Sequence, residues 1–369
     1  MSYIKKILKK IAPTIVIEWL KKARLSASLV FLPLINKNKI FANFYYIFVQ
    51  KFSGEQLAVI RGRRAYYQSL ENIGSSCALL RRNTHRLEKG LIMRPRRSVF
   101  AEDYIQETVE CYNEVVRIPL FDENEKKWAG DVLEQYFTLV RKTKITDEAR
   151  KVYVLAREHY ETATTELNKK SKGRLAYIPY IHTDLPSSSI KFDQLKVLFH
   201  KRRSVRWYKD QNVPFNVVQQ AVNVASLAPS ACNRQPYTFH FCNNKSKAVS
   251  IAKCAGGTSG FAENLPAIIV VVGDLSVYPL EEDRHLIYID GSLATMQLML
   301  ALETLGLSTC SINWQDSEEN ENKIREIVEL KDYERIVMLL SVGYADPQGG
   351  IPYSQKKNDE FILNDISKA

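Results

Sequence analysis

The sequence lacks the cysteine and histidine patterns that mark most metal and redox centres. Its six cysteines include no C-x-x-C pair and no spacing typical of metal ligands, and its six histidines form no metal motif. No nucleophile, base and acid arrangement typical of a hydrolase is recognisable. We therefore expect free thiols in a reducing cytoplasm and no metal site. The cysteines are Cys77, Cys111, Cys232, Cys242, Cys254 and Cys310.

Long apolar runs and nucleic-acid motifs are absent as well. No uninterrupted apolar stretch reaches the roughly 18 residues that a membrane span needs, since Glu18 and Lys21 break the first candidate. No small-residue cleavage pattern follows a clean apolar segment, so we expect no cleaved signal peptide. Residues 255–260 are rich in glycine, but they lack the spacing of a dinucleotide fingerprint and favour a mobile loop. With no recognised binding motif, we expect no nucleic-acid partner.

Positive charge is concentrated in the N-terminal part of the chain. The formal net charge is +11, but residues 1–100 hold 20 Lys and Arg against 4 Asp and Glu, a net of +16. Residues 101–369 hold 32 against 37, a net of −5. Within residues 4–24, lysines are interleaved with isoleucine, leucine and tryptophan, the composition of a helix that lies in a membrane interface. We expect either peripheral contact with anionic membrane or ordinary surface helices.

A second basic cluster follows at residues 81–97, and its role stays open. Its first members recur at spacings that gather them on one face of a helix, and they are Arg81, Arg82, His85, Arg86 and Lys89. Such a face could bind a phosphorylated or acidic substrate. Alternatively, Glu88 and the acidic segment at residues 102–134 neutralise it internally.

The chain divides into two parts by composition. Residues 101–170 are typical of two or more helices, and residues 178–189, rich in proline and serine, are typical of a linker. We place the boundary near residue 188. A basic, mainly helical region then occupies residues 1–188, and a second domain occupies residues 189–369, beginning with a short amphipathic helix from Phe192.

Two short polar stretches of the second part carry most of the chemical information. In residues 202–206, three arginines surround Ser204, a donor set that suits a phosphate monoester. Residues 229–236 supply amide side chains that both donate and accept. Between them, residues 214–227 show the apolar spacing of an amphipathic helix entered through Pro214. The two loops are therefore joined by one helix, and we expect them to face one site.

The remaining pattern predicts an α+β core. Residues 267–273 and 335–343 are apolar, β-branched runs typical of strands buried on both faces. Residues 290–302 predict a long core helix, ended by Gly306.

Together these motifs, over about the last 180 residues, resemble the nitroreductase family of flavoproteins. The resemblance implies a mixed sheet flanked by helices, here preceded by a mainly α-helical N-terminal domain. It implies FMN as cofactor and a homodimer in which the second loop comes partly from the opposite subunit. The residues it assigns to cofactor binding are Arg202, Ser204, Arg206, Pro229, Ser230, Asn233, Gln235 and Gly343, with Arg203 ambiguous and with Lys356 or Lys357 where many relatives carry Arg.

The resemblance also implies the reaction. Hydride passes from NAD(P)H to the flavin and then to a small acceptor in two steps through one site, and the choice between NADH and NADPH stays open. No catalytic side chain is required, although a backbone N–H within Ser311, Ile312, Asn313 and Trp314 is expected near flavin N5, and Trp314 or Tyr237 could form an aromatic wall. Two alternatives remain: flavin-consuming or dehalogenating chemistry on the same fold, and a non-catalytic membrane-associated or assembly protein that retains the domain as a scaffold.

Overall fold

The computed structural model describes residue 33 and residues 38–168 and 176–368, with the side chains of residues 164–168 and 368 excepted. The expected interfacial segment at residues 4–24 and the expected helix end at residues 169–173 lie outside them. The chain divides into two compact units, residues 1–56 and residues 57–369. In the first unit, helix α3 (Lys39–Val49) is capped by the Asn38 side chain, which accepts from the N–H of Ile40.

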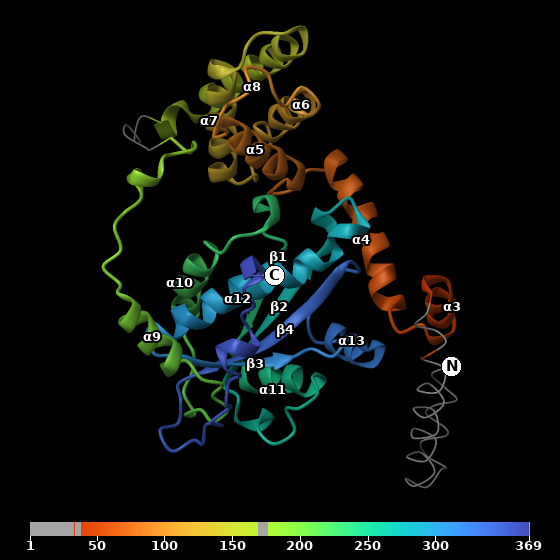
Figure 1. Ribbon diagram of the computed structural model, residues 1–369, viewed down its shortest axis with the longest axis vertical. Coiled ribbons are helices and arrows are strands. Elements are labelled where there is room, and N and C mark those ends of the chain that lie inside the picture. The colour runs from red at the N-terminus through yellow and green to blue at the C-terminus, as the bar shows by residue number, and fades with distance from the viewer. Residues whose placement is uncertain (1–32, 34–37, 169–175, 369) are drawn as a thin grey trace. The chain divides into compact units, whose positions relative to one another are not determined.

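Residues 53–168 form five helices, α4 to α8, joined by loops (Figure 1). They are α4 (Ser53–Glu71), α5 (Ala78–Leu91), α6 (Ile105–Val115), α7 (Glu123–Leu139) and α8 (Lys144–Asn168). Helices α5 to α8 share one apolar core, in which Leu80, Ile105 and Leu133 are fully buried. This arrangement confirms the helices predicted within residues 101–170 and the helical face expected at residues 81–89.

A four-stranded sheet forms the centre of the C-terminal part. Its strands are β1 (Tyr237–Cys242), β2 (Ala267–Asp274), β3 (Ser308–Asn313) and β4 (Glu334–Gly343). Their order is β1-β2-β4-β3 and every neighbouring pair is antiparallel. The one parallel contact in the described residues is an isolated bridge between Ser204 and Thr309, so the sheet is mixed only through that bridge. Both predicted core strands are confirmed, as is the α+β class.

Helices cover both faces of this sheet, which explains why β2 is apolar from Ala267 to Gly273. They are α10 (Phe215–Ala225), α11 (Lys245–Cys254), α12 (Leu286–Thr304) and α13 (Glu318–Arg325), and α9 (Phe192–Lys201) packs against α12. Alternate residues of β2 point to opposite faces: Ile269 packs with α10 and α12, whereas Ile268 packs with α11 and α13. Gly306 follows α12 with a φ of 81°, the left-handed conformation expected after a helix end.

Helix α12 and the 3₁₀ turn that precedes it form one segment, Glu281–Thr304. By length and composition alone, this segment is long and apolar enough to span a membrane. It packs on the sheet through Leu298 and Leu302, both fully buried, so its apolar character is that of a core helix. Short 3₁₀ turns complete the fold at His182–Asp184, Ala231–Asn233, Ala262–Asn264, Leu275–Val277, Glu281–His285, Asp359–Phe361 and Ile366–Lys368.

Helix α4 packs closely against the sheet-containing part. Ala58 and Val59 share a buried cluster with Leu275, Tyr278 and Ile287. Residues 180–189 are exposed and contain no helix or strand beyond one 3₁₀ turn, as expected of a linker. The domain boundary near residue 188 stays a prediction.

Candidate functional site

The arginine loop runs beside the edge strand β3. Arg202 ends α9 and donates its N–H to the carbonyl of Leu198 at 2.9 Å. Two residues on, Ser204 bridges Thr309, and Val205 donates its N–H to the Thr309 carbonyl at 3.0 Å. Arg202, Arg203, Ser204 and Arg206 are all half-buried. The loop therefore fixes its polar side chains against the open edge of the sheet.

The three arginines of this loop differ in how their guanidinium groups are used. Arg203 turns to the C-terminal segment, where it donates to the carbonyls of Pro352 (2.9 Å) and Tyr353. Arg206 donates to the Ser204 carbonyl at 3.4 Å and lies 5.6 Å from the Phe261 ring. The Arg202 guanidinium makes no hydrogen bond or ion pair within the described part of the chain. Most donors of Arg202 and Arg206 are therefore free to bind an anion.

Buried acidic groups beside the loop respond to these charges. Burial raises the pKa of the Glu303 carboxyl, while Lys201, a hydrogen bond from Ser308 and Arg202 act against that rise. Burial also raises the pKa of the Cys310 thiol, against the opposing effects of Arg206, a hydrogen bond with Ser204 and Arg202. The loop thus projects positive potential onto the end of α12 and the middle of β3.

Strand β3 offers backbone donors at its outer edge. Thr309 directs its carbonyl away from β4 toward Val205, and alternate residues of a strand share a direction. The N–H groups of Ser311 and Asn313 therefore point to the same outer edge, and both residues are exposed, whereas Ile312 is buried. The backbone donor expected near flavin N5 in this stretch stays a prediction.

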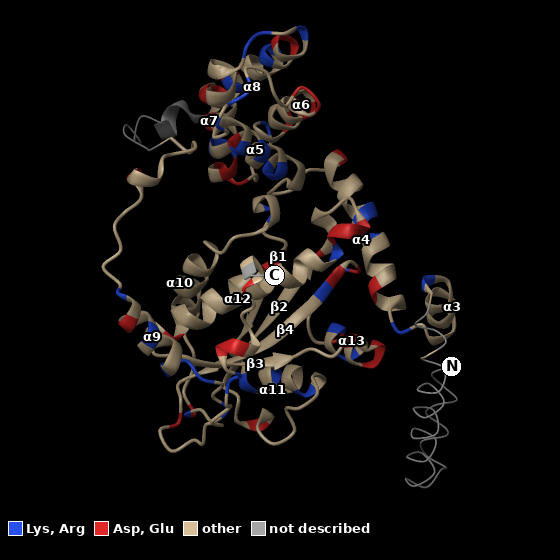
Figure 2. Cartoon of the chain, in the orientation of Figure 1, with Lys and Arg blue, Asp and Glu red and all other residues tan. Residues whose placement is uncertain are grey.

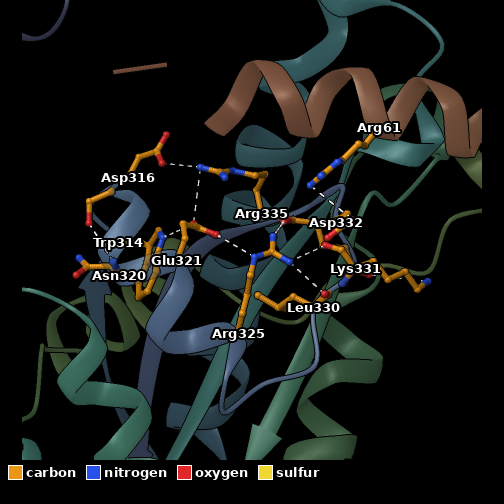
Figure 3. Close-up of polar contacts among 12 residues, drawn as sticks. Arg61, Trp314, Asp316, Asn320, Glu321, Arg325, Leu330, Lys331, Asp332 and Arg335 are labelled. Atoms are coloured by element: carbon orange, nitrogen blue, oxygen red, sulfur yellow. Dashed lines mark hydrogen bonds and ion pairs between the residues drawn. The ribbon is translucent and has the colours of Figure 1, made fainter. Parts of the chain in front are cut away.

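Trp314 belongs to the core and not to an exposed aromatic wall. Only 9% of it is exposed, and its indole N–H donates to the buried Glu321 carboxylate at 2.9 Å (Figure 3). Arg335 lies 3.7 Å from the same carboxylate and donates to Asp316 at 2.6 Å. Arg325, 3.8 Å from Glu321, continues this chain of contacts. The group thereby ties α13 to the loop after β3.

The second loop has an unusual backbone that organises its own polar groups. Cys232, Asn233 and Gln235 adopt positive φ angles of 52°, 52° and 50°. Ser230 accepts the N–H of Gln235 at its hydroxyl (3.0 Å) and the N–H of Asn233 at its carbonyl (3.0 Å). The N–H of Ala231 donates to the Asp290 carboxylate at 2.9 Å.

Arg81 of α5 contacts this loop, which sequence analysis missed. Its guanidinium donates to the Asn233 carbonyl and to the Gln235 amide oxygen, both at 3.0 Å, and pairs with Glu125 at 3.0 Å. Gln235 also donates to the Ser226 carbonyl at 2.9 Å, so its side chain is engaged within the chain at both ends. Because 152 residues separate Arg81 from Asn233, no local pattern could have revealed the contact.

The rest of the basic cluster on α5 is partly neutralised. His85 contacts Glu88 at 3.1 Å, and Arg86 contacts Asp103 at 3.3 Å. Arg82 and Lys89 have no ion pair in the described ranges. Internal neutralisation, one of the two expectations, therefore applies to Arg81, His85 and Arg86.

The two polar loops of one chain lie at opposite ends of α12. The second loop contacts Asp290 through Ala231, whereas Lys201, next to the first loop, lies 3.9 Å from Glu303. Asp290 and Glu303 are 13 positions apart in one helix, about 20 Å at 1.5 Å per residue. The connecting helix α10 therefore does not bring the two loops of one chain together, and the expectation that they face one site rests on a second copy, as the resemblance implies.

The remaining predicted site residues have plain structural settings. A Cβ at Gly343 would lie 2.7 Å from Pro266 Cγ and Tyr208 Cδ1, so the glycine is required there by packing. Lys356 and Lys357 are exposed and have no ion pair within residues 38–168 and 176–368. Pro229 is exposed at the start of the second loop.

Comparisons with known proteins agree with this fold. Iodotyrosine deiodinase 1 of Pongo abelii is 22% identical over 225 residues, 53% of this chain and 77% of that protein. A putative NADH dehydrogenase/NAD(P)H nitroreductase of Archaeoglobus fulgidus is 29% identical over 152 residues, 40% of this chain and 83% of that protein. The solved structure of an FMN-dependent nitroreductase from Clostridium difficile R20291 shares 27% identity, covers 42% of this chain and 91% of its own, and has a TM-score of 0.37. Residues 200–344 match the model of the Nitroreductase family, so the chain contains a nitroreductase-family domain.

Proposed function

We propose that the protein is an FMN-dependent oxidoreductase that transfers electrons from NAD(P)H to a small acceptor. The observation that carries the proposal is the pair of half-buried guanidinium groups, Arg202 and Arg206, whose donors are nearly all unused beside the open edge of β3. Each guanidinium offers five N–H donors in a rigid fork suited to phosphate. The name of the C. difficile neighbour includes FMN dependence, which supports this choice of ligand.

The chain's residues fit the two ends of that cofactor. Arg202, Arg206 and the Ser204 hydroxyl would bind the phosphate, and the N–H groups of Ser311 and Asn313 would donate to the ring. When bound, FMN supplies the hydride chemistry. The protein's part is to orient the ring, to hold positive charge near it and to exclude water. Arg203 would act indirectly, by holding the C-terminal segment through its hydrogen bonds to the Pro352 and Tyr353 carbonyls. Gly343 would also act indirectly, by allowing Tyr208 to pack closely against it.

A second copy of the chain would complete the site. Because the loops of one chain lie about 20 Å apart along α12, Ser230 and Asn233 would reach a flavin held by the arginine loop of the partner. Helix α12 leaves Ile289, Leu293 and Met296 between 38% and 48% exposed at i, i+4, i+7 spacing, an apolar face suited to a homodimer. Free thiols at all six cysteines are consistent with a cytoplasmic site of action, where NAD(P)H is available.

The proposal is tested by the visible absorption spectrum of the protein after gel filtration with FMN, before and after anaerobic NADPH or NADH. We expect retained flavin that bleaches with at least one donor. The Arg202→Ala/Ser204→Ala double variant should lose FMN, whereas Lys209→Ala, which removes an exposed charge from the same loop, should retain it. A colourless wild type would favour the scaffold alternative, and unchanged FMN retention in the double variant would reject the phosphate site.

Reductive dehalogenation is the second candidate reaction. It is favoured by the relatives named iodotyrosine deiodinase, whose alignments cover 53% of this chain. Iodide release from 3-iodotyrosine by the flavin-loaded, dithionite-reduced protein would identify this reaction. Rapid reduction of a nitroaromatic or quinone without iodide release would leave the general reductase as the function.

A further inference from the structure

Helix α3 presents an apolar face that nothing in the described chain covers. Five large side chains on it are at least 55% exposed, with Phe48 at 83%. They are Ile40, Phe41, Phe44, Ile47 and Phe48. Their i, i+1, i+4, i+7, i+8 spacing puts them on one side of the helix, and no residue of α3 is buried.

Such a face is unusual on a water-soluble surface helix. A helix that packs on a protein core buries its apolar stripe, and contiguous exposed apolar patches mark interaction sites. With 11 residues, α3 is about 16 Å long and cannot cross a hydrocarbon layer of about 30 Å. A helix of this length and composition is suited to lie in the plane of an interface.

The charges around α3 select the kind of interface. Only one of its residues is charged, and Figure 2 shows the helix almost free of ionised side chains. Lys39 at its start and Lys51 just beyond its end are exposed and make no ion pair with any described residue. The first 100 residues carry a net charge of +16. Basic residues beside an apolar face attract anionic lipid headgroups and are repelled by a second copy of the same basic segment.

We propose that α3 is a peripheral membrane anchor whose face of Ile40, Phe44, Ile47, Phe41 and Phe48 inserts into the interfacial layer of an anionic bilayer. Lys39 and Lys51 would contact phosphate headgroups, since a lysine stem can extend along the apolar surface while its ammonium stays at the polar layer. Tyr45, which flanks the apolar face, suits the headgroup level. The inference is independent of flavin binding.

Vesicle co-sedimentation of the full chain tests this anchor. We compare extruded vesicles of phosphatidylcholine alone with vesicles that also contain phosphatidylglycerol, at low and high salt. Wild type is expected to sediment with the anionic vesicles and to be released by salt. Phe41→Ser/Phe44→Ser/Phe48→Ser should lower the partition coefficient about 10-fold or more. The matched control, Phe361→Ser/Ile362→Ser/Leu363→Ser, removes equally exposed apolar side chains from the C-terminal segment and should bind as wild type.

Two results would overturn the proposal. Equal vesicle binding by the α3 variant and wild type would assign any membrane affinity to another part of the chain. Failure of wild type to bind anionic vesicles, with an α3-dependent shift in oligomeric state by analytical ultracentrifugation, would assign the face to a second copy. Because α3 buries no residue, the variants are expected to keep the wild-type circular dichroism, which verifies that they fold.

Discussion

Arg81 shows how one side chain links distant segments of this fold. Its guanidinium bonds a carboxylate of α7, a main-chain carbonyl and an amide oxygen of the second loop. Glu125 in turn accepts from the Cys77 N–H (3.1 Å) and the Ser76 hydroxyl (2.6 Å), which fixes it at the start of α5. The loop that we expect at the flavin ring is therefore held in place by the helical region.

Replacing Arg81 should destabilise the protein markedly. Arg81→Ala leaves Glu125, 4% exposed, without its cation, and we expect a loss of about 3 kcal/mol, the lower end for a broken buried pair because Glu125 keeps two hydrogen bonds. Arg82→Ala is the matched control, since Arg82 is half-buried on the same helix but its guanidinium makes no hydrogen bond or ion pair in the described residues. The free energies of unfolding come from urea titration. Equal effects of the two changes would contradict this role.

Asp290 should give the protein a distinct pH dependence. Burial raises the pKa of its carboxyl above the ordinary value of 3.8, against hydrogen bonds from Ala231 and Tyr278 and the charge of Arg234. The folded state therefore binds this proton more tightly than the unfolded state, so the contribution to stability is greatest below 3.8 and falls as pH rises through the raised value.

The Asp290→Asn variant isolates this titration. Asn cannot ionise, yet its oxygen can still accept the Ala231 N–H. The stability of the variant relative to wild type should rise with pH, beginning near 3.8, and become constant above the raised pKa. Thermal unfolding of both proteins across this range provides the measurement. A difference that is flat with pH, or that falls, would mean that the Asp290 pKa is not raised.

Single-residue roles were less predictable than the positions of the loops. Local composition identified the arginine loop, but it could not show that Arg203 turns toward Pro352 while Arg202 stays unpaired. The indole of Trp314 was one of two candidates for an aromatic wall, but it is buried. Its N–H partner, Glu321, lies in a helix whose position depends on the whole β3–α13–β4 arrangement.

At the scale of elements, strong local patterns predicted most of the core. The apolar runs of β2 and β4 and the helix α12 were placed correctly because burial on both faces leaves an unambiguous signal. Strand β1 was not predicted: its sequence, YTFHFC, has the polar residues of a half-exposed edge strand. Helix α13 was also missed, since its residues are mostly charged and Ile324 is its one apolar side chain.

Helix α4 provides an element-scale test of close packing. A Cβ at Gly62 would lie 2.7 Å from Leu275 Cβ and 2.8 Å from the Leu275 carbonyl oxygen, so backbone must shift to admit it. Gly→Ala in an exposed helix stabilises by about 1 kcal/mol, whereas overpacking costs about 1–3 kcal/mol.

We therefore expect Gly62→Ala to lower the free energy of unfolding, opposite to the effect of helix propensity alone. Gly74→Ala, where nothing lies within 4 Å of an added Cβ, should change stability little. Differential scanning calorimetry of the two variants distinguishes these effects. A higher melting temperature for Gly62→Ala would show that α4 does not approach Leu275 this closely.

At the scale of the whole molecule, residues before and after the predicted boundary near residue 188 pack against each other and form hydrogen bonds. The exposed linker at residues 180–189 is a genuine interruption of secondary structure, which composition predicted. However, Ala58 and Val59 complete a buried cluster with Leu275, Tyr278 and Ile287, and Arg81 bonds the second loop. Composition describes segments one at a time, so it could not show that an early helix contributes to the core of a later domain.

Truncation should reveal this dependence. A fragment of residues 53–369 keeps all of α4 and Arg81, and we expect it to fold, remain monodisperse and retain FMN. A fragment of residues 189–369 keeps the whole arginine loop but uncovers Leu275 and Tyr278, so it should aggregate or melt at a clearly lower temperature. Gel filtration, thermal melting and the flavin spectrum of both fragments give the comparison.

Equal melting temperatures of the two fragments would show that the C-terminal domain is independent of α4, and the boundary near residue 188 would then be a true domain boundary. If only the shorter fragment loses flavin while both stay folded, the helical region serves the site through Arg81 more than it serves stability.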